Sequence, residues 1–148
     1  MNHIGLVSPN IEDLSRVFRV LGMDAATEPV PDPLQKVSAS FVEVGHGRDL
    51  HIEILEPTEK DSPITGFLEK RGGGLHHLCF EVDDIGEASS HLVRHGFKMV
   101  CAPVECAAYD VSMKRRCSTP SRIAFFLVDD RLLLEIIEIG RRKGDGDA

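Results

Sequence analysis

The sequence lacks any apolar run that approaches the ~20 residues needed to span a bilayer, and its N-terminus does not resemble a signal peptide. Positive charge is also scarce, because 17 lysines and arginines stand against 24 aspartates and glutamates and give a formal net charge of −7. General nucleic-acid binding is disfavoured, since it needs a positive field that neutralises phosphates. The four cysteines show no Cys-x-x-Cys spacing, which argues against a disulfide framework or a structural zinc site. We therefore expect a cytoplasmic protein with reduced thiols and with no membrane or nucleic-acid partner.

The chain does contain an internal repeat. The segment Asn2–Val7 returns 74 positions later as His76–Glu81, and the same offset relates His3 to His77. Its 148 residues, of which 42% are hydrophobic and 28% charged, have an ordinary globular composition. Two halves of about 70 residues could therefore share a single core.

Each half also ends on an apolar strand that contains one glutamate, Glu53 in the first half and Glu135 in the second. Their offset is 82 rather than 74, so the second half carries about eight extra residues, which we place in the 101–121 loop. Loops of this kind commonly shape substrate pockets.

Hydrophobic periodicity and turn residues predict the elements between these anchors. In the first half we expect a strand at 3–7, a helix capped near Asn10 and ended by Gly22, and a proline-rich loop at 29–33. The predicted domain covers residues 1–139, with repeats at about 1–56 and 75–139, a linker at 57–74 and a disordered tail at 140–148. The remaining predictions are strands at 37–44 and 50–55 with a hairpin around 45–47, a short linker helix starting at Ser62-Pro63, a strand at 75–82, a helix to about 95, and strands near 97–101, 122–128 and 131–139.

The paired histidines and glutamates carry the main functional signal. A carboxylate among aliphatic residues is costly to bury unless it is paired, hydrogen-bonded or bound to a metal. Taken singly, either glutamate could face solvent and His3 could be an ordinary core histidine. Their occurrence at matching places favours a site built from His3, Glu53, His77 and Glu135. Two imidazoles and two carboxylates suit Co, Mn, Ni, Zn or Fe, and such a site supports proton transfer beside a carbonyl, ring opening or oxygen chemistry.

At these residues the chain resembles the glyoxalase/bleomycin-resistance/dioxygenase (vicinal oxygen chelate) superfamily. The resemblance rests on the segments Asn2–Val7, Val20–Gly22 and Leu75–Ile85. Within the superfamily the chain is most similar to methylmalonyl-CoA epimerases, through Ile52–Pro57, Asp61–Ile64 and Phe67–Lys70.

The resemblance implies an α+β fold in which two βαβββ modules form an open, cup-shaped mixed sheet around a central metal and substrate cavity. It implies that the four residues named above bind a divalent metal, that Glu135 also moves a proton, and that the protein is a homodimer. The expected activity is that of a metal-dependent isomerase or epimerase acting on a small acyl-thioester, such as a CoA thioester, or on another carbonyl substrate. Alternatives are a lactoylglutathione lyase, a ring-cleaving dioxygenase and a non-catalytic antibiotic-binding protein.

Two departures from the epimerase pattern matter. Epimerases usually show an acidic proton-transfer residue followed by Gln-Gly-Val, whereas this chain reads Asp32-Pro-Leu-Gln-Lys-Val, so Asp32 is the candidate second catalytic residue. They also usually carry a His-Pro-Lys element before the last strand, which is absent here. Candidate substrate-binding residues are His51, which shares a strand face with Glu53, and the run Lys114, Arg115 and Arg116, which could meet a phosphate or carboxylate.

Overall fold

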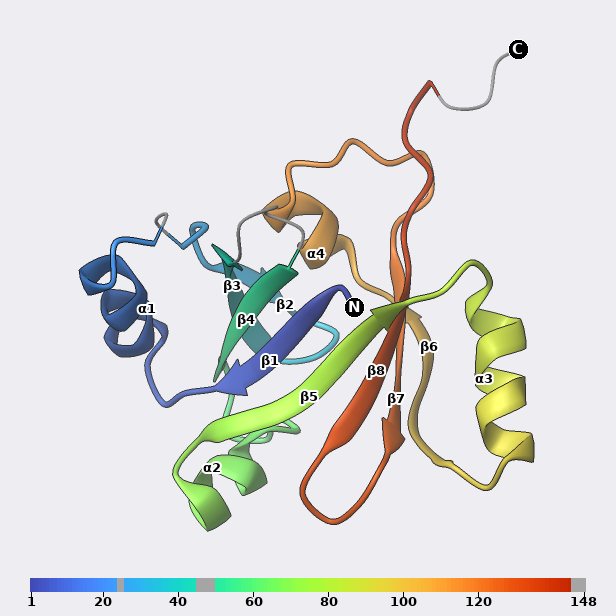
Figure 1. The fold of residues 1–148 in the computed structure, drawn as a ribbon, viewed down its shortest axis with the longest axis horizontal. Helices are drawn as coiled ribbons and strands as arrows, with labels where there is room; N and C mark the ends of the chain where they lie inside the picture. Colours follow the sequence, from blue (N-terminus) through green and yellow to red (C-terminus); the bar gives the residue numbers. More distant parts are fainter. Residues whose placement is uncertain (24–25, 45–49, 145–148) are drawn as a thin grey trace. The chain divides into compact units, whose positions relative to one another are not determined.

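The structure is a computed structural model in which residues 1–23, 26–44 and 50–144 are described (Figure 1). The chain divides into two compact units, one formed by Asn2–His77 and the other by Met1 together with Leu78–Ala148. Within the described residues, no helix is long and apolar enough to cross a membrane. The elements are β1 (His3–Val7), α1 (Ile11–Val20), β2 (Val30–Asp32), β3 (Val37–Val44), β4 (Leu50–Pro57), α2 (Thr65–Arg71), β5 (Gly74–Glu81), α3 (Ile85–Arg94), β6 (Lys98–Glu105), α4 (Ala107–Ser112), β7 (Arg122–Leu127) and β8 (Leu133–Glu138).

Each unit follows the predicted strand-helix-strand-strand-strand order, which confirms the α+β class with two βαβββ modules. Strand β5 is continuous across the boundary, with residues 74–77 in the first unit and 78–81 in the second. The second module differs by one insertion, the short helix α4 between β6 and β7. This helix occupies the region where the repeat offsets predicted extra residues.

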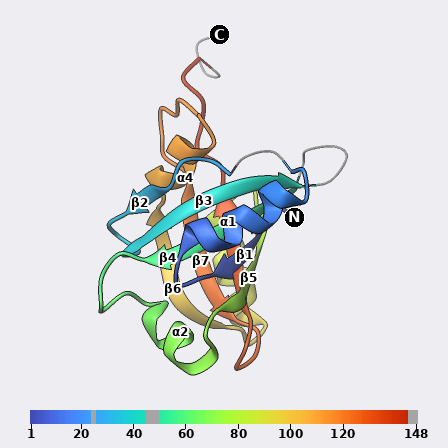
Figure 2. The same cartoon turned by 90° about the vertical axis from the view of Figure 1, so that its left-hand side faces the viewer.

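In the first unit the strand order is β2-β3-β4-β1, with β1 and β4 parallel and the other pairs antiparallel. Helix α1 packs through Ile11 and Phe18 against Val42 of β3 and Ile54 of β4 (Figure 2). Because side chains alternate between the faces of a strand, burying Ile54 under the helix turns its neighbour Glu53 to the opposite face. The helix therefore determines which face of this sheet is polar.

The second unit repeats this arrangement on its own strands. The order is β8-β7-β6, and helix α3 packs through Ile85 against Ala124, Phe126 and Ile136. Alternation along β8 then turns Glu135 to the face away from α3. Each glutamate thus lies on the sheet face away from the helix, because its aliphatic neighbours pack against the helix of the same unit.

A second pair of glutamates, which the sequence patterns did not predict to be functional, caps the N-termini of α1 and α3. Glu56 at the end of β4 accepts a hydrogen bond from the Ile11 backbone N–H at 2.8 Å, and Glu138 at the end of β8 does the same for Ile85, also at 2.8 Å. Carboxylates at helix N-termini satisfy unpaired N–H groups and interact favourably with the helix dipole. The cap predicted near Asn10 is also present, because the Asn10 side chain accepts a hydrogen bond from the Glu12 N–H.

Four expectations about local structure need correction. The proline-rich segment is not all loop, since Val30–Asp32 forms the edge strand β2, where Pro31 needs no ladder partner for its missing N–H. Strand β6 continues to Glu105, and the linker helix begins at Thr65 rather than at Ser62-Pro63. The tail is ordered at its start, where residues 141–143 pair with 116–118. The predicted hairpin turn at 45–47 lies outside the described residues, as do 145–148.

Candidate metal centre

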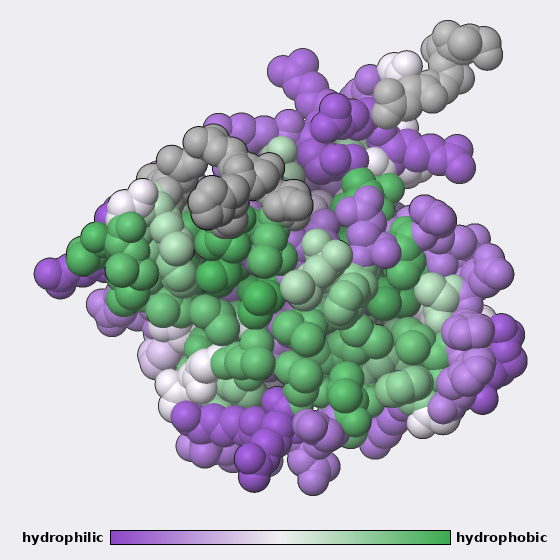
Figure 3. All heavy atoms as spheres, in the orientation of Figure 1, coloured by the Kyte–Doolittle hydropathy of each residue, from purple (hydrophilic) through white to green (hydrophobic). Residues whose placement is uncertain are grey.

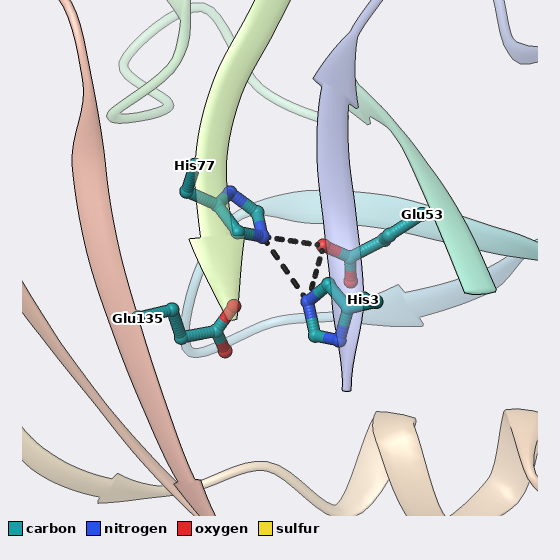
Figure 4. A group of neighbouring side chains, drawn as sticks. All are labelled: His3, Glu53, His77 and Glu135. Carbon is teal, nitrogen blue, oxygen red and sulfur yellow. Dashed lines mark hydrogen bonds and ion pairs between the residues drawn. The ribbon is translucent and has the colours of Figure 1, made fainter. Parts of the chain in front are cut away.

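Three predicted ligands meet within the first unit, each from a different strand. His3 lies on β1, Glu53 on β4 and His77 on β5 (Figure 4). His3 is 1% exposed and His77 is 0% exposed, so neither imidazole is solvated. They form a group of donor atoms of the kind that can hold a metal ion.

The donor atoms are spaced as the ligands of one metal ion would be. His77 Nε2 lies 3.1 Å from Glu53 Oε2 and 3.1 Å from His3 Nε2, and His3 Nε2 lies 3.4 Å from Glu53 Oε2. Metal–ligand bonds of about 2.1 Å place adjacent ligand atoms about 3.0 Å apart in an octahedron and about 3.4 Å apart in a tetrahedron. The observed triangle therefore fits the first coordination shell of a small divalent cation.

The outer nitrogen of each ring, Nδ1, contacts the residue that precedes the histidine in the sequence. His3 Nδ1 lies 2.8 Å from Asn2 Oδ1, an acceptor, so the proton of this imidazole sits on Nδ1. His77 Nδ1 lies 3.0 Å from His76 Nδ1, so the preceding residue again contacts the outer nitrogen. A neutral imidazole with its proton on Nδ1, as in His3, presents its Nε2 lone pair to the triangle, where a metal ion could accept it. Sequence patterns assigned no such part to Asn2 or His76.

Burial of Glu53 would raise its pKa, but His3 and His77 together hold the pKa of this carboxyl well below its ordinary value. The carboxylate is therefore anionic at neutral pH although it is largely enclosed. An enclosed anion facing two imidazoles attracts a cation into the site.

Gly5 provides the space that the His77 ring occupies. A Cβ added at Gly5 would lie 2.0 Å from His77 Cε1 and 2.3 Å from its Nε2. No side chain can therefore replace this hydrogen without moving the imidazole. Phe41 packs edge-on against His3, with ring centroids 5.6 Å apart, and restrains the second ring. These two supporting residues were missed because neither carries a chemically reactive group.

Glu135, the fourth predicted ligand and the remaining side chain of Figure 4, belongs to the second unit. It is 4% exposed and lies on β8 opposite Phe125 of β7. Its place on β8 corresponds to that of Glu53 on β4, with Ile54 and Ile136 following them under their respective helices.

His51 lies on the same sheet face as His3, with which it is directly paired in the β1–β4 register. Its Nε2 is 3.9 Å from Glu43 Oε1. Burial lowers its pKa, His3 lowers it further, and Glu43 opposes the shift. The half-buried ring is thus a neighbour of the metal triad, and its substrate-binding role stays a prediction.

Asp32 is buried at a turn rather than beside the triad. Its Oδ1 accepts hydrogen bonds from the Leu34 and Gln35 N–H groups at 2.9 and 3.2 Å. Asp32 pairs with Val37, whereas Glu53 pairs with Phe41, four residues further along β3. Four strand residues span about 13 Å. This placement favours a structural role in the turn, and its proposed catalytic role stays a prediction.

The three residues of the basic run in the inserted loop differ in burial and in contacts. Arg115 is partly buried, donates from Nη2 to the Gly140 carbonyl at 3.1 Å and lies 3.7 Å from Asp110, so its guanidinium holds the loop to the C-terminal segment. Lys114 and Arg116 are exposed. These two are more accessible than Arg115, and the substrate-binding role of all three stays a prediction.

Comparison with known proteins shows the family of the chain. The profile described as Glyoxalase/Bleomycin resistance protein/Dioxygenase superfamily matches residues 2–113, about three quarters of the chain. The chain belongs to this superfamily.

Among curated superfamily members, the chain is 38% identical over 111 residues to the mitochondrial methylmalonyl-CoA epimerase of Mus musculus, an alignment that covers 74% of this chain and 60% of the mouse protein. It is 34% identical over 102 residues to the ethylmalonyl-CoA/methylmalonyl-CoA epimerase of Cereibacter sphaeroides, covering 68% of this chain and 73% of that protein. The chain thus spans about 60% of the length of its mammalian relatives.

Solved structures of similar proteins cover nearly the whole chain. A hypothetical protein from Bacillus halodurans matches with a TM-score of 0.76 at 27% identity, covering 98% of this chain and 97% of the other. Methylmalonyl-CoA epimerase from Mycobacterium tuberculosis matches with a TM-score of 0.72 at 25% identity, covering 94% and 87%. The superfamily fold therefore extends over both units, including the residues beyond 113.

The backbone conformation at Lys36 bears on the comparison of the Gln-Lys-Val segment with Gln-Gly-Val. Lys36 has a φ of 52°, a left-handed conformation that glycine adopts at low cost. This conformation agrees with matching Gln-Lys-Val to Gln-Gly-Val, in which Lys36 takes the place of the glycine. In that register the preceding acidic position falls on Leu34, and Asp32 lies two residues too early.

Proposed function

We propose that this protein is a divalent-metal-dependent epimerase that moves the proton on the carbon next to the carbonyl of a CoA thioester, with a methylmalonyl-CoA-like substrate. The triangle of His3, Glu53 and His77 carries the proposal, because its spacing suits a metal that retains open positions for substrate oxygens. The identities of 34–38% to named epimerases support the choice of substrate class.

In the proposed site His3, Glu53 and His77 hold the cation, and Glu135 contributes from the second unit. A bound divalent cation would polarise the thioester carbonyl and stabilise the negative charge that develops on its oxygen. Asn2 keeps the proton of His3 on Nδ1, and His76 would do the same for His77 when its own Nδ1 accepts, so that both Nε2 atoms are available as ligands.

Proton transfer is assigned to Glu135. A carboxylate removes the proton from the α-carbon, which becomes planar, and a proton donated to the other face by a second acid or by water then gives the epimer. When Gln-Lys-Val is matched to Gln-Gly-Val, the acidic position falls on Leu34. Asp32 is therefore a less favoured candidate for the second proton-transfer group.

Deuterium wash-in at the α-carbon of methylmalonyl-CoA tests the proposal directly. Metal-loaded protein should catalyse exchange, and Glu135→Gln should lower its rate by about 10²–10⁴-fold. Glu105→Gln, which alters an exposed glutamate of the same unit, is the matched control and should leave exchange unchanged. Absence of exchange with the wild-type, metal-loaded protein would eliminate the proposed activity.

Asp32→Asn belongs in the same series. The amide retains the Oδ1 acceptor that the turn uses, so the fold should survive while any acid-base function is lost. We expect near-normal exchange and epimerisation. Exchange retained without epimerisation would instead assign protonation of the second face to Asp32.

Metal analysis separates this enzyme from an antibiotic-binding relative. Protein purified without chelator should contain close to one divalent ion per chain. A protein without metal that binds an antibiotic would support the non-catalytic alternative. Turnover of the hemithioacetal of methylglyoxal and glutathione, with no exchange on the CoA thioester, would support the lyase.

A further inference from the structure

Two basic tripeptides far apart in the sequence are joined in the second unit. Lys114-Arg115-Arg116 follows helix α4, and Arg141-Arg142-Lys143 follows strand β8. Together they contain six of the 17 lysines and arginines of a chain with a net charge of −7. A local excess of positive charge in an acidic protein requires a specific explanation.

Backbone hydrogen bonds hold the two segments side by side. Lys143 N–H donates to the Arg116 carbonyl at 2.9 Å, and Ser118 N–H donates to the Arg141 carbonyl at 2.7 Å. Between them Cys117 and Arg142 form an antiparallel bridge. The cationic side chains are therefore presented by a paired ribbon rather than by two independent loops.

A buried polar network anchors this ribbon to the unit. Asp110, 6% exposed, accepts from the Ser121 N–H at 2.8 Å and from the Ser121 hydroxyl at 2.6 Å. The Ser121 Oγ in turn accepts from the Gly140 N–H at 2.8 Å, and Arg115 binds the Gly140 carbonyl. Gly140 has no room for a side chain, since a Cβ would lie 2.3 Å from the Thr119 carbonyl oxygen.

The remaining cations are directed to solvent. Lys114, Arg116, Arg141, Arg142 and Lys143, here called the basic patch, are all exposed. In the part of the chain that the structure describes, no carboxylate lies within ion-pair distance of any of the five. Figure 3 shows hydrophilic side chains gathered around the C-terminal segment. A group of five exposed cations without an ion-pair partner among the described residues attracts a compact polyanion.

We propose that the basic patch binds the phosphate groups in the nucleotide part of a coenzyme A thioester, an inference that rests on the proposed function. Coenzyme A carries a diphosphate and a ribose phosphate, and arginine recognises phosphate through paired N–H donors. The ordered ribbon lowers the entropy lost on binding. An extended nucleic acid is a poor fit, because the acidic remainder of the chain would repel it.

The first test measures binding without metal or turnover. Isothermal titration of coenzyme A and of adenosine 3′,5′-bisphosphate into the full chain should show binding that weakens as salt increases. The double variant Arg142→Gln/Lys143→Gln should weaken both affinities by about 10–100-fold, as expected for lost charge-assisted hydrogen bonds. The matched control Arg16→Gln/Arg94→Gln, at exposed positions of α1 and α3, should leave them unchanged.

The second test uses a substrate without phosphates. The double variant should raise KM for the CoA thioester with little change in kcat, and should process the corresponding pantetheine thioester as well as wild type does. Equal binding of coenzyme A by variant and wild type would overturn the proposal. So would tighter binding of duplex DNA or anionic lipid vesicles than of the nucleotide. Nucleotide binding without α-proton exchange would instead refute the proposed function alone.

Discussion

Substitution of Gly5 by alanine should disrupt the metal triad through a single methyl group. The added Cβ would lie 2.0 Å from His77 Cε1, 2.3 Å from Nε2 and 2.4 Å from Nδ1. Carbon atoms in contact normally lie about 3.5–4.0 Å apart, so the imidazole must withdraw by about 1.5 Å. Metal ligands tolerate displacements of only about 0.2 Å. The variant should therefore lose divalent-metal affinity by at least about 100-fold.

The same overlap should reduce stability without metal. Overpacking in a close-packed core typically costs about 1–3 kcal/mol, which for a chain of this size lowers Tm by about 2–4 °C per kcal/mol. Gly66→Ala is the matched control, because a Cβ at Gly66 in helix α2 would have nothing within 4 Å. It should be neutral or stabilise the protein by up to about 1 kcal/mol, as alanine exceeds glycine in helix propensity.

Competition with a chromophoric chelator measures metal affinity, and thermal unfolding in chelator measures stability. A double-mutant cycle isolates the cause, since Gly5→Ala should cost little when His77→Ala has already removed the ring. Equal metal affinity in Gly5→Ala and Gly66→Ala would refute the argument. An unchanged cost of Gly5→Ala in the His77→Ala background would do so as well.

Three further predictions concern Glu53, the helix caps and His76. Because the folded-state pKa of Glu53 is depressed, its contribution to the free energy of unfolding is present above its unfolded pKa of about 4.3 and is lost as the pH falls. Metal-free wild type should thus lose more stability than Glu53→Gln between pH 5 and pH 3 in denaturant titrations; parallel losses would contradict this. Glu56→Ala and Glu138→Ala should each cost about 0.5–2 kcal/mol, measured by urea unfolding, with Glu105→Ala as the unaffected reference. His76→Leu should weaken metal binding about 10–100-fold, and His76→Asn, which copies the acceptor before His3, should largely restore it. Ring-nitrogen correlation spectra of the metal-free protein should show the Nδ1–H tautomer of the ligand histidine in wild type and His76→Asn. An unchanged tautomer in His76→Leu would remove the assigned role.

Local patterns in the sequence were sufficient to predict the repeated module and the three donors that meet in the first unit. Helical spacing places Ile11 and Phe18 on one face of α1, and strand alternation places Glu53 opposite Ile54. Both patterns depend only on neighbours along the chain. The recurrence at offsets of 74 and 82 then distinguished His3, Glu53 and His77 from ordinary polar residues. The fold class was predictable for the same reason.

Contacts between distant residues were decided by the tertiary structure. Position 5 has no room for a side chain because the ring of His77 lies against the β1 backbone there. The local sequence around Gly5 or around His77 does not predict this contact. Glu56 and Glu138 accept hydrogen bonds from the helix N-termini at Ile11 and Ile85, which lie 45 and 53 positions earlier in the sequence. The basic patch likewise depends on pairing across 25 residues of sequence. Sequence periodicity specifies which face a side chain occupies, whereas packing of the whole unit specifies which atoms it meets.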